Sequence, residues 1–261
     1  MNRVQALASF EKLLDIMDEL REKCPWDKKQ TFNTLRNLTI EEVYELADAI
    51  IEHDTNEIKK ELGDILLHIV FYSKIASEQN QFSITDVIDS LCEKLIYRHP
   101  HVFGEESLEN SQQVKVRWEQ LKQHEKGRKQ GVLSGVPESL PALIKASRMQ
   151  SKARAVGFDW DNKEDVWTKV TEEVRELQHE LTQEHNELHI ENEFGDVLFS
   201  IINAARLYGV DPETALEKTN KKFRRRFNYL EQKTKEQGKE LSNMTLEEMD
   251  VFWNEAKQLE K

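Results

Sequence analysis

Apolar residues recur at spacings of three and four along most of the chain, which is the pattern of amphipathic helices with one buried stripe. A convincing alternation with a period of two, which would indicate strands, is not seen. We therefore predict an all-α protein with four or five helices in each half, each burying its apolar stripe. The clearest stripes are Val43, Leu46, Ala47 and Ile50; Leu62, Ile65, Leu66 and Ile69; and Phe194, Val197, Leu198 and Ile201.

Several polar pairs have the spacing of helix N-termini. A Thr followed three residues later by Glu predicts a capping box, in which both side chains accept hydrogen bonds from the first backbone N–H groups. An Asp followed by Pro predicts an N-cap with proline in the first turn. The candidates are Thr39 with Glu42, Thr245 with Glu248, and Asp211 with Pro212.

The two halves of the chain match each other. Four blocks recur in the same order with small shifts, which indicates a duplicated domain. Each copy should bury its own core or share one with its twin. The matched blocks are "EEVYEL" (41–46) with "EEVREL" (172–177), "ELGDILL" (61–67) with "EFGDVLF" (193–199), "EKLIYRHPHVF" (93–103) with "EKTNKKFRRRF" (217–227), and "RWEQLK" (117–122) with "FWNEAK" (252–257).

A short stretch between the halves is rich in glycine and proline. Of the 9 Gly and 5 Pro in the chain, three Gly and two Pro lie within residues 124–141, which is typical of a linker. We therefore predict an N-terminal domain at 1–123, a linker at 124–138 and a C-terminal domain at 139–261.

The composition narrows the class of protein. The chain has 261 residues, 33% of them charged, and a net charge of −12. This balance argues against nucleic acid as the main ligand, because binding a phosphate backbone needs clustered cations. No run of 18 apolar residues is present, so we predict no membrane span. Two cysteines give neither a disulfide framework nor zinc spacing, and we expect a cytoplasmic setting.

Acidic residues recur in pairs on two predicted helices of each half. Two carboxylates three residues apart lie on one flank of a helix, beside its apolar stripe. If the two helices pack antiparallel, these flanks can face each other, and four carboxylates converge at the edge of the core. The sets are Glu42, Glu45, Glu61 and Asp64 in the first half, and Glu173, Glu176, Glu193 and Asp196 in the second.

Four converging carboxylates repel one another unless a cation neutralises them. Oxygen ligands without a nearby histidine suit Mg²⁺, with Mn²⁺ as the alternative. Magnesium held by carboxylates keeps positions open for water and phosphate oxygens, which points to phosphoryl chemistry. The competing interpretation is that the acids form solvated faces and that Glu42 only completes the cap at Thr39. The repetition of the whole set favours a metal site.

The second half also carries candidate groups for an anionic substrate. Lys222 and Arg226 are four residues apart on one helical face and could hold the phosphates that the metal does not reach. Surface salt bridges are the alternative for this pair. Trp253 and Lys257 have the same spacing, so that Trp253 could stack on a base while Lys257 reaches a phosphate. For Trp253 alone, a place in the core is the favoured interpretation.

These motifs together are similar to those of a known family. The motifs are the two acid sets, "CPWDKKQT" (24–31), "RHPHVF" (98–103), "GFDW" (157–160), and Trp253 with Lys257 near the end of the chain. The combination resembles the MazG family of nucleoside triphosphate pyrophosphohydrolases over nearly the whole chain. The resemblance implies Mg²⁺-dependent cleavage between the α and β phosphates, giving a nucleoside monophosphate and pyrophosphate. It also implies duplicated helical domains with four-helix-bundle cores that form across a homodimer.

The resemblance assigns roles by position. They are magnesium binding by Glu173, Glu176, Glu193 and Asp196; a place beside the substrate for Glu172 and Lys169; phosphate binding by Lys222 and Arg226; and a nucleotide contact for Trp253. The catalytic carboxylates would be Glu172, Glu173 and Glu176. The sequence does not decide whether Glu172 or Glu176 accepts the proton of the attacking water.

The resemblance also implies that the C-terminal copy carries the activity. In the first half, Arg98 stands opposite Lys222 in the matched blocks. Val102 stands opposite Arg226, so one of the two cations has no counterpart. We therefore expect that the first half can bind metal but is poorly equipped for a triphosphate.

There are two alternatives to an enzyme of broad nucleotide specificity that maintains the nucleotide pool. One is a regulatory module that senses a nucleotide or a protein and retains the acids as a relic; intact acids beside Lys222 and Arg226 argue against it. The other is an enzyme selective for one nucleotide, such as dUTP or dCTP, because spacing does not reveal the shape of a base pocket. A homodimer is expected by analogy, and a regulatory protein partner stays open.

Overall fold

The computed structural model describes residues 2–108, 110, 113–114, 117–118, 121, 131–160, 162–183 and 186–260. The chain divides into two compact units, 1–122 and 123–261. Of the predicted linker, residues 124–130 lie outside the described ranges, and the remainder includes the short 3₁₀ helix η2 (Val132–Gly135). The exact limits of the linker stay a prediction.

Both units are helical, and the predicted all-α class is confirmed: the described ranges contain no strand. None of their helices has the length and apolar character that crossing a bilayer needs. The first unit contains α1 (Arg3–Lys23), η1 (Asp27–Lys29), α2 (Phe32–Glu52), α3 (Thr55–Glu78), α4 (Ile84–Arg98) and α5 (Pro100–Phe103). The second contains η2, α7 (Ala142–Ala155), α8 (Asp165–Glu180), α9 (Glu187–Leu207), α10 (Pro212–Glu236), η3 (Leu241–Asn243) and α11 (Leu246–Leu259).

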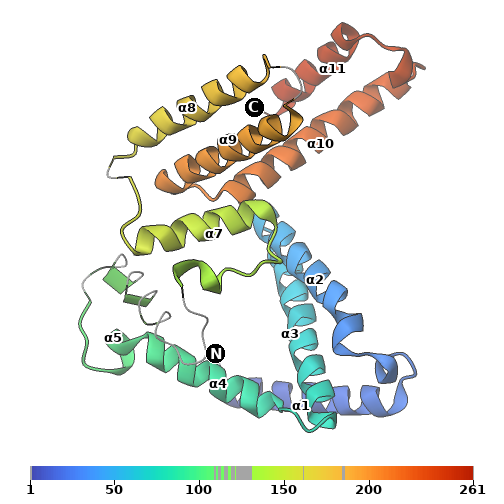
Figure 1. The fold of residues 1–261 in the computed structure, drawn as a ribbon. Helices are drawn as coiled ribbons and strands as arrows, with labels where there is room; N and C mark the ends of the chain where they lie inside the picture. Colours follow the sequence, from blue (N-terminus) through green and yellow to red (C-terminus); the bar gives the residue numbers. More distant parts are fainter. Residues whose placement is uncertain are drawn as a thin grey trace. The chain divides into compact units, whose positions relative to one another are not determined.

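Each unit is built around one helical hairpin that carries the acid pairs. In the first unit α2 and α3 lie side by side, and in the second α8 and α9 do the same (Figure 1). The turn between α2 and α3 is short because His53 adopts a left-handed conformation with φ 57°, and Asp54 caps α3 at once. Each hairpin therefore brings its "EExxE" helix against its "ExxD" helix, as predicted.

Two of the three predicted helix starts are confirmed. Glu248 and Thr245 form a capping box at α11. Asp211 caps α10, accepting a hydrogen bond of 2.8 Å from the backbone N–H of Thr214, and Pro212 is in the first turn.

The predicted capping box of Thr39 with Glu42 is wrong. Helix α2 begins two turns earlier, where Thr31 and Thr34 form the capping box. Thr39 is inside the helix, and its hydroxyl lies 2.6 Å from Nδ1 of His68 and 2.7 Å from the hydroxyl of Tyr72. Glu42 is therefore not explained by a cap.

The predicted apolar stripes do not supply the core of either unit. Leu62, Leu66 and Ile69 on α3, and Phe194, Leu198 and Ile201 on α9, are all exposed in the single chain. The face of α3 that packs inside its unit runs instead through Glu61, His68 and Phe71. The prediction failed because periodicity identifies an apolar face but not the neighbour that covers it. Glu61 and Glu173 consequently lie on the packed face of their hairpins, whereas Glu45, Glu176 and Asp196 are exposed.

The buried cores are small. The first unit packs around Met17, Leu35, Val70, Phe71 and Ile75. The second has one cluster of Val166, Val170 and Ala204 between α8 and α9, and another of Leu230, Met244 and Phe252 between α10 and α11. The cluster between α8 and α9 fixes the hairpin that positions the second acid set.

Candidate functional site

Three acids of the second copy converge between α8 and α9. Glu173 on α8 and Glu193 and Asp196 on α9 each place one carboxylate oxygen within 4.8 Å of the others. Glu173 is buried, Glu193 half-buried and Asp196 exposed. The cluster therefore reaches from the hairpin interior to solvent, as a metal site that also receives a substrate requires.

The charges in this cluster are only partly compensated. The ammonium group of Lys169 lies 2.7 Å from Glu173 and 2.8 Å from Glu172, and these two carboxylates raise the pKa of Lys169. Oε2 of Glu193 is buried and accepts no hydrogen bond from the described residues. Burial, followed by the charges of Glu176, Asp196 and Glu173, raises the pKa of Glu193. A divalent cation would supply the missing charge.

Glu172 and Glu176 lie beside this cluster rather than in it. Both are exposed on α8 and line an open hollow together with Trp167, Thr171 and Arg175. Glu172 is held by Lys169, whereas Glu176 is near enough to Glu193 to act on its pKa. The structure thus brings together three of the four predicted ligands, and the role of Glu176 as a ligand stays a prediction.

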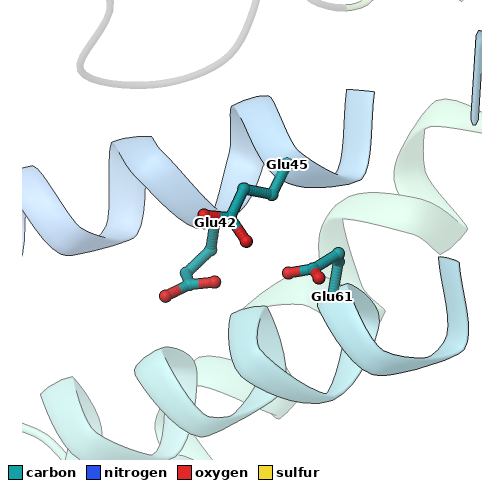
Figure 2. Close-up of side chains that lie close together, drawn as sticks. All are labelled: Glu42, Glu45 and Glu61. Atoms are coloured by element: carbon teal, nitrogen blue, oxygen red, sulfur yellow. The ribbon is translucent and has the colours of Figure 1, made fainter. Parts of the chain in front are cut away.

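The first copy has an equivalent cluster in a different combination. Glu42 and Glu45 of α2 and Glu61 of α3 direct their carboxylates into the space between the two helices (Figure 2), with one oxygen of each within 4.8 Å of the others. Asp64 is outside the cluster, although its charge contributes to the raised pKa of Glu42. The first set therefore uses two of the three acids of "EExxE" with one acid of "ExxD", whereas the second uses one acid of "EExxE" with both acids of "ExxD".

A cavity of about 400 Å³ adjoins the second cluster. Its wall is largely apolar and aromatic, and Lys169, Glu173 and Asp196 are part of its lining. The apolar residues are Leu133, Met149, Ala153, Phe158, Trp160, Val166 and Phe199, and the other polar residues are Gln150, Asp159, Ser200, Asn203 and Arg206. A cavity of this size and character is suited to a planar, partly apolar group.

The polar groups of the cavity are fixed in place. Nε2 of the buried Gln150 donates a hydrogen bond of 2.8 Å to the carbonyl of Phe199. Its Oε1 is buried and accepts no hydrogen bond from the described residues. Arg206 binds Asp159, with Nη1 donating over 3.1 Å, and also donates from Nε to Asn203.

This cavity could not be predicted from the sequence. Its wall comes from η2, α7, α8, α9 and the loop between α7 and α8. The "GFDW" stretch was the available signal: Gly157 has φ 88°, a conformation that suits glycine, and turns the chain toward the cavity residues Phe158 and Trp160. The spacing of residues along the sequence does not indicate that this loop lies beside Gln150 or Asn203 in the fold.

The predicted cationic residues belong to the α10–α11 hairpin. Nε of Arg226 donates a hydrogen bond of 2.9 Å to Glu260, and its guanidinium lies 5.8 Å from the ring centroid of Trp253. Lys222 and Lys257 are exposed. Neither Lys222 nor Arg226 lines the 400 Å³ cavity.

Trp253 is half-buried against the core of that hairpin. It packs on the cluster of Leu230, Met244 and Phe252, and its ring centroid lies 5.1 Å from that of Phe223. These contacts favour the core interpretation of Trp253, and a direct contact with nucleotide stays a prediction.

Comparison with known proteins decides the family. The sequence model of the MazG nucleotide pyrophosphohydrolase domain matches residues 30–103 and 162–230, which contain both acid clusters. The chain belongs to the MazG family. The predicted duplication of the MazG domain is thereby confirmed.

Named relatives support the same assignment. The chain is 42% identical over 257 residues to the nucleoside triphosphate pyrophosphohydrolase of Escherichia coli, covering 96% of this chain and 98% of that protein. It is 44% identical over 251 residues to the nucleoside triphosphate pyrophosphohydrolase/pyrophosphatase MazG of Thermotoga maritima, covering 95% of each. A Mycobacterium tuberculosis nucleoside triphosphate pyrophosphohydrolase is 39% identical over 153 residues, covering 57% of this chain and 46% of that protein.

The two MazG copies differ where the second has its cavity. Alignment of "ELGDILL" with "EFGDVLF" places His68 opposite Ser200 and Phe71 opposite Asn203. His68 and Phe71 are both buried inside the first unit. The small polar residues that line the cavity in the second MazG copy are thus replaced by two rings in the first.

Proposed function

We propose that the second MazG copy hydrolyses nucleoside triphosphates between the α and β phosphates, releasing a nucleoside monophosphate and pyrophosphate. The observation that carries this proposal is the junction of an acid cluster with an apolar cavity: Glu173 and Asp196 belong to both. The names of the relatives in Escherichia coli and Thermotoga maritima support the same reaction.

The acid cluster fits a magnesium ion. All its donors are carboxylate oxygens, and the buried Oε2 of Glu193 has no other partner among the described residues. Glu173, Glu193 and Asp196 would hold the ion, and Glu176 would join them from the rim. When bound, Mg²⁺ supplies positive charge against the phosphate oxygens; Mn²⁺ would serve similarly.

Three groups take part in the proposed reaction: the attacking water, the α-phosphorus and a carboxylate that accepts the proton of the water. The water oxygen attacks the α-phosphorus, the bond from that phosphorus to the α–β bridging oxygen breaks, and pyrophosphate leaves. The proton of the water passes to the exposed carboxylate of Glu172 or Glu176. Lys169 holds Glu172 and Glu173 in position through its two ion pairs.

This bond assignment has a direct isotope test. Hydrolysis in ¹⁸O-labelled water is expected to place the label in the monophosphate, because the attack is on the α-phosphorus. Label found in the pyrophosphate would mean attack on the β-phosphorus and would overturn the proposal. Mass spectrometry of the two products distinguishes these outcomes.

The cavity would take the base of the nucleotide. Phe158 and Trp160 offer aromatic surfaces, and stacking on them tolerates different bases, which supports a broad specificity. Lys222 and Arg226 would bind the outer phosphates, with the substrate displacing Glu260 from Arg226. Trp253 would then support Arg226 through its ring, and Lys257 would add charge from the next helix.

Gln150 is expected to select among bases. Its unpartnered Oε1 would accept a hydrogen bond from an exocyclic amino group, a neutral bond worth about 1 kcal/mol. Gln150→Leu should therefore lower kcat/KM for ATP by roughly fivefold to tenfold. Purine riboside triphosphate, which lacks the amino group, serves as the matched substrate and should lose much less. An equal loss for both substrates would contradict the assignment.

The exposed stripes support a homodimer. Phe194, Leu198 and Ile201 form an apolar face on α9, and soluble proteins cover faces of this kind. We expect the wild type to sediment at twice the 30.7 kDa chain mass, and Leu198→Glu to shift it toward monomer. Leu188→Glu, on the same helix but off this face, is the control. A wild type that sediments as a monomer would contradict the homodimer.

A regulatory role is favoured only for the first copy. Two rings, His68 and Phe71, occupy the positions of the cavity residues Ser200 and Asn203 there. The first copy would then influence the second, or bind a regulatory protein, without turnover of its own. A cytoplasmic location is proposed from the composition alone.

A further inference from the structure

Two arginines of α10 hold a single carboxylate of the second copy. The carboxylate belongs to Glu260, the residue directly after α11, and each of its oxygens is bound by one of the two guanidinium groups. Oε1 accepts hydrogen bonds of 2.8 Å and 2.5 Å from Nε and Nη2 of Arg225. Oε2 accepts hydrogen bonds of 2.9 Å and 2.5 Å from the corresponding atoms of Arg226. We call Arg225 and Arg226 together the arginine clamp.

The arginine clamp has donors that suit a phosphate group as well as a carboxylate. Arginine binds both kinds of anion through the same forked pair of N–H groups. A terminal phosphate carries more negative charge than one carboxylate, so two adjacent cations attract it more strongly. The clamp also borders an open hollow of about 420 Å³, with Tyr229 and Ala256 in its lining. This hollow leaves room for an anion larger than the side chain of Glu260.

The clamp is fixed more firmly than the carboxylate that occupies it. The side chain of Arg226 is 17% exposed, and its guanidinium lies 5.8 Å from the ring centroid of Trp253, which packs on the core of the hairpin. Glu260, by contrast, follows the end of a helix, and its neighbour Leu259 is 71% exposed. Because helix ends open at little cost in free energy, Glu260 can leave the clamp without disturbing the core.

The occupied clamp still attracts anions. Hydrogen bonds from Arg226, followed by those from Arg225, lower the pKa of Glu260, so its carboxylate is ionised at neutral pH. It supplies one negative charge against the two positive charges of the arginines. Since protonation does not empty the clamp near neutral pH, a competing anion must displace Glu260.

The first copy has no such clamp. In the matched blocks, His101 stands opposite Arg225 and Val102 stands opposite Arg226. Neither residue has the forked donors of a guanidinium group. The arginine clamp therefore occurs in the same copy as the aromatic cavity, which links it to the substrate of that copy.

We propose that Glu260 is a built-in competitor for the outer phosphates of the substrate and thereby a specificity-determining residue of the second copy. This inference rests on the proposed function, in which Arg226 binds those phosphates, and it adds Arg225 as a second arm of their site. A ligand with outer phosphates displaces Glu260, whereas a nucleoside monophosphate has no group to place in the clamp. The apparent affinity for the phosphate chain is reduced by the fraction of molecules in which Glu260 occupies the clamp.

Binding of inorganic pyrophosphate tests this role without turnover. Pyrophosphate consists of the two outer phosphates and is not cleaved in the proposed reaction. We expect Glu260→Gln to lower the Kd of pyrophosphate for the full chain by roughly threefold to tenfold, because the competing charge is removed. Glu260→Ala should lower the Kd at least as much, since the amide of glutamine can still accept a hydrogen bond from arginine. Isothermal titration calorimetry in the presence of Mg²⁺ measures the Kd.

Three controls show whether the effect belongs to the clamp. Glu247→Gln makes the same exchange at an exposed position of α11 and should leave the Kd of pyrophosphate unchanged. Adding Arg226→Gln to Glu260→Gln should abolish the gain in affinity, because one arm of the clamp is then missing. AMP, which has no outer phosphates, should bind Glu260→Gln and the wild type with the same Kd.

The sign of the effect distinguishes a competitor from a structural ion pair. If Glu260 only stabilises the hairpin, its removal lowers the Tm and leaves the Kd of pyrophosphate unchanged or raises it, and this result overturns the inference. Equal gains for pyrophosphate and AMP, or for Glu260→Gln and Glu247→Gln, also overturn it. Tighter pyrophosphate binding that requires Arg226 supports it.

Nucleotide hydrolysis is assayed separately, so that the two proposals can fail independently. Tighter pyrophosphate binding by Glu260→Gln in a chain that does not hydrolyse nucleotides supports the competitor and rejects the proposed catalysis. Hydrolysis by a chain whose pyrophosphate binding does not respond to Glu260→Gln or Glu260→Ala supports the proposed catalysis and rejects the competitor.

Discussion

Glu193→Gln is expected to lower kcat/KM for nucleoside triphosphates by about 10²- to 10³-fold, equivalent to roughly 3–4 kcal/mol of transition-state stabilisation. The side chain keeps its size but loses the charge that would bind the metal. Its Oε2 has no other partner among the described residues, so no existing contact would substitute for the ion. Steady-state kinetics at saturating Mg²⁺ measure the change.

Glu191→Gln is the matched control for this variant. Glu191 is exposed on the same helix and is not in the cluster. The same substitution there should leave kcat/KM within about twofold, because exposed charges contribute little. Equal activity of Glu193→Gln and Glu191→Gln would show that the cluster does not serve catalysis.

Asn203→Phe is expected to impair nucleotide binding by filling the cavity. The change introduces into the second copy the residue type that stands at the matched position in the first, Phe71. A ring at this position would exclude the base, so we expect KM to rise about 10²-fold, the effect of losing roughly 3 kcal/mol of binding. Kinetics with ATP measure this, and the effect should be smaller for inorganic triphosphate, which has no base.

Two controls separate exclusion from loss of structure. Asn228→Phe makes the same exchange at an exposed position of α10 and should leave KM unchanged. Inserting a ring into a packed site costs about 1–3 kcal/mol, so thermal unfolding of Asn203→Phe must show that it is still folded. A folded Asn203→Phe with wild-type KM would mean that the base binds elsewhere.

The acid clusters could be predicted from the sequence because their geometry is local. Two carboxylates three residues apart on a helix lie on one side of it, whatever surrounds the helix. A short turn between α2 and α3 then forces the helices to pack antiparallel. Duplication made the pattern visible twice. What spacing did not decide is which three acids meet: Glu45 joins in the first copy and its counterpart Glu176 does not in the second.

The neighbours of each helix could not be predicted in the same way. Leu62 and Leu198 are apolar at helical spacing, yet both are exposed, because their helices present the acid-bearing face to the rest of the unit. Thr39 has the spacing of a cap but lies inside α2, since Thr31 caps the helix earlier. In both cases the contacts made in the folded chain, and not the local sequence pattern, decide which residues are buried and where the helix begins.

The cavity depends wholly on long-range contacts. Gln150 and Phe199 are far apart in sequence, and their hydrogen bond exists only once α7 packs on α9. The aromatic loop at Phe158 and Trp160 completes the wall. Apart from the "GFDW" stretch, none of these residues has a spacing that distinguishes it from an ordinary helix or loop residue.

Product analysis tests the central claim most directly. The full chain is incubated with a panel of canonical and modified nucleoside triphosphates, with Mg²⁺ or with EDTA, and the products are separated by ion-exchange chromatography. We predict nucleoside monophosphate and pyrophosphate in the presence of Mg²⁺ and no turnover in EDTA. Nucleoside diphosphate with orthophosphate, or turnover that persists in EDTA, would contradict it.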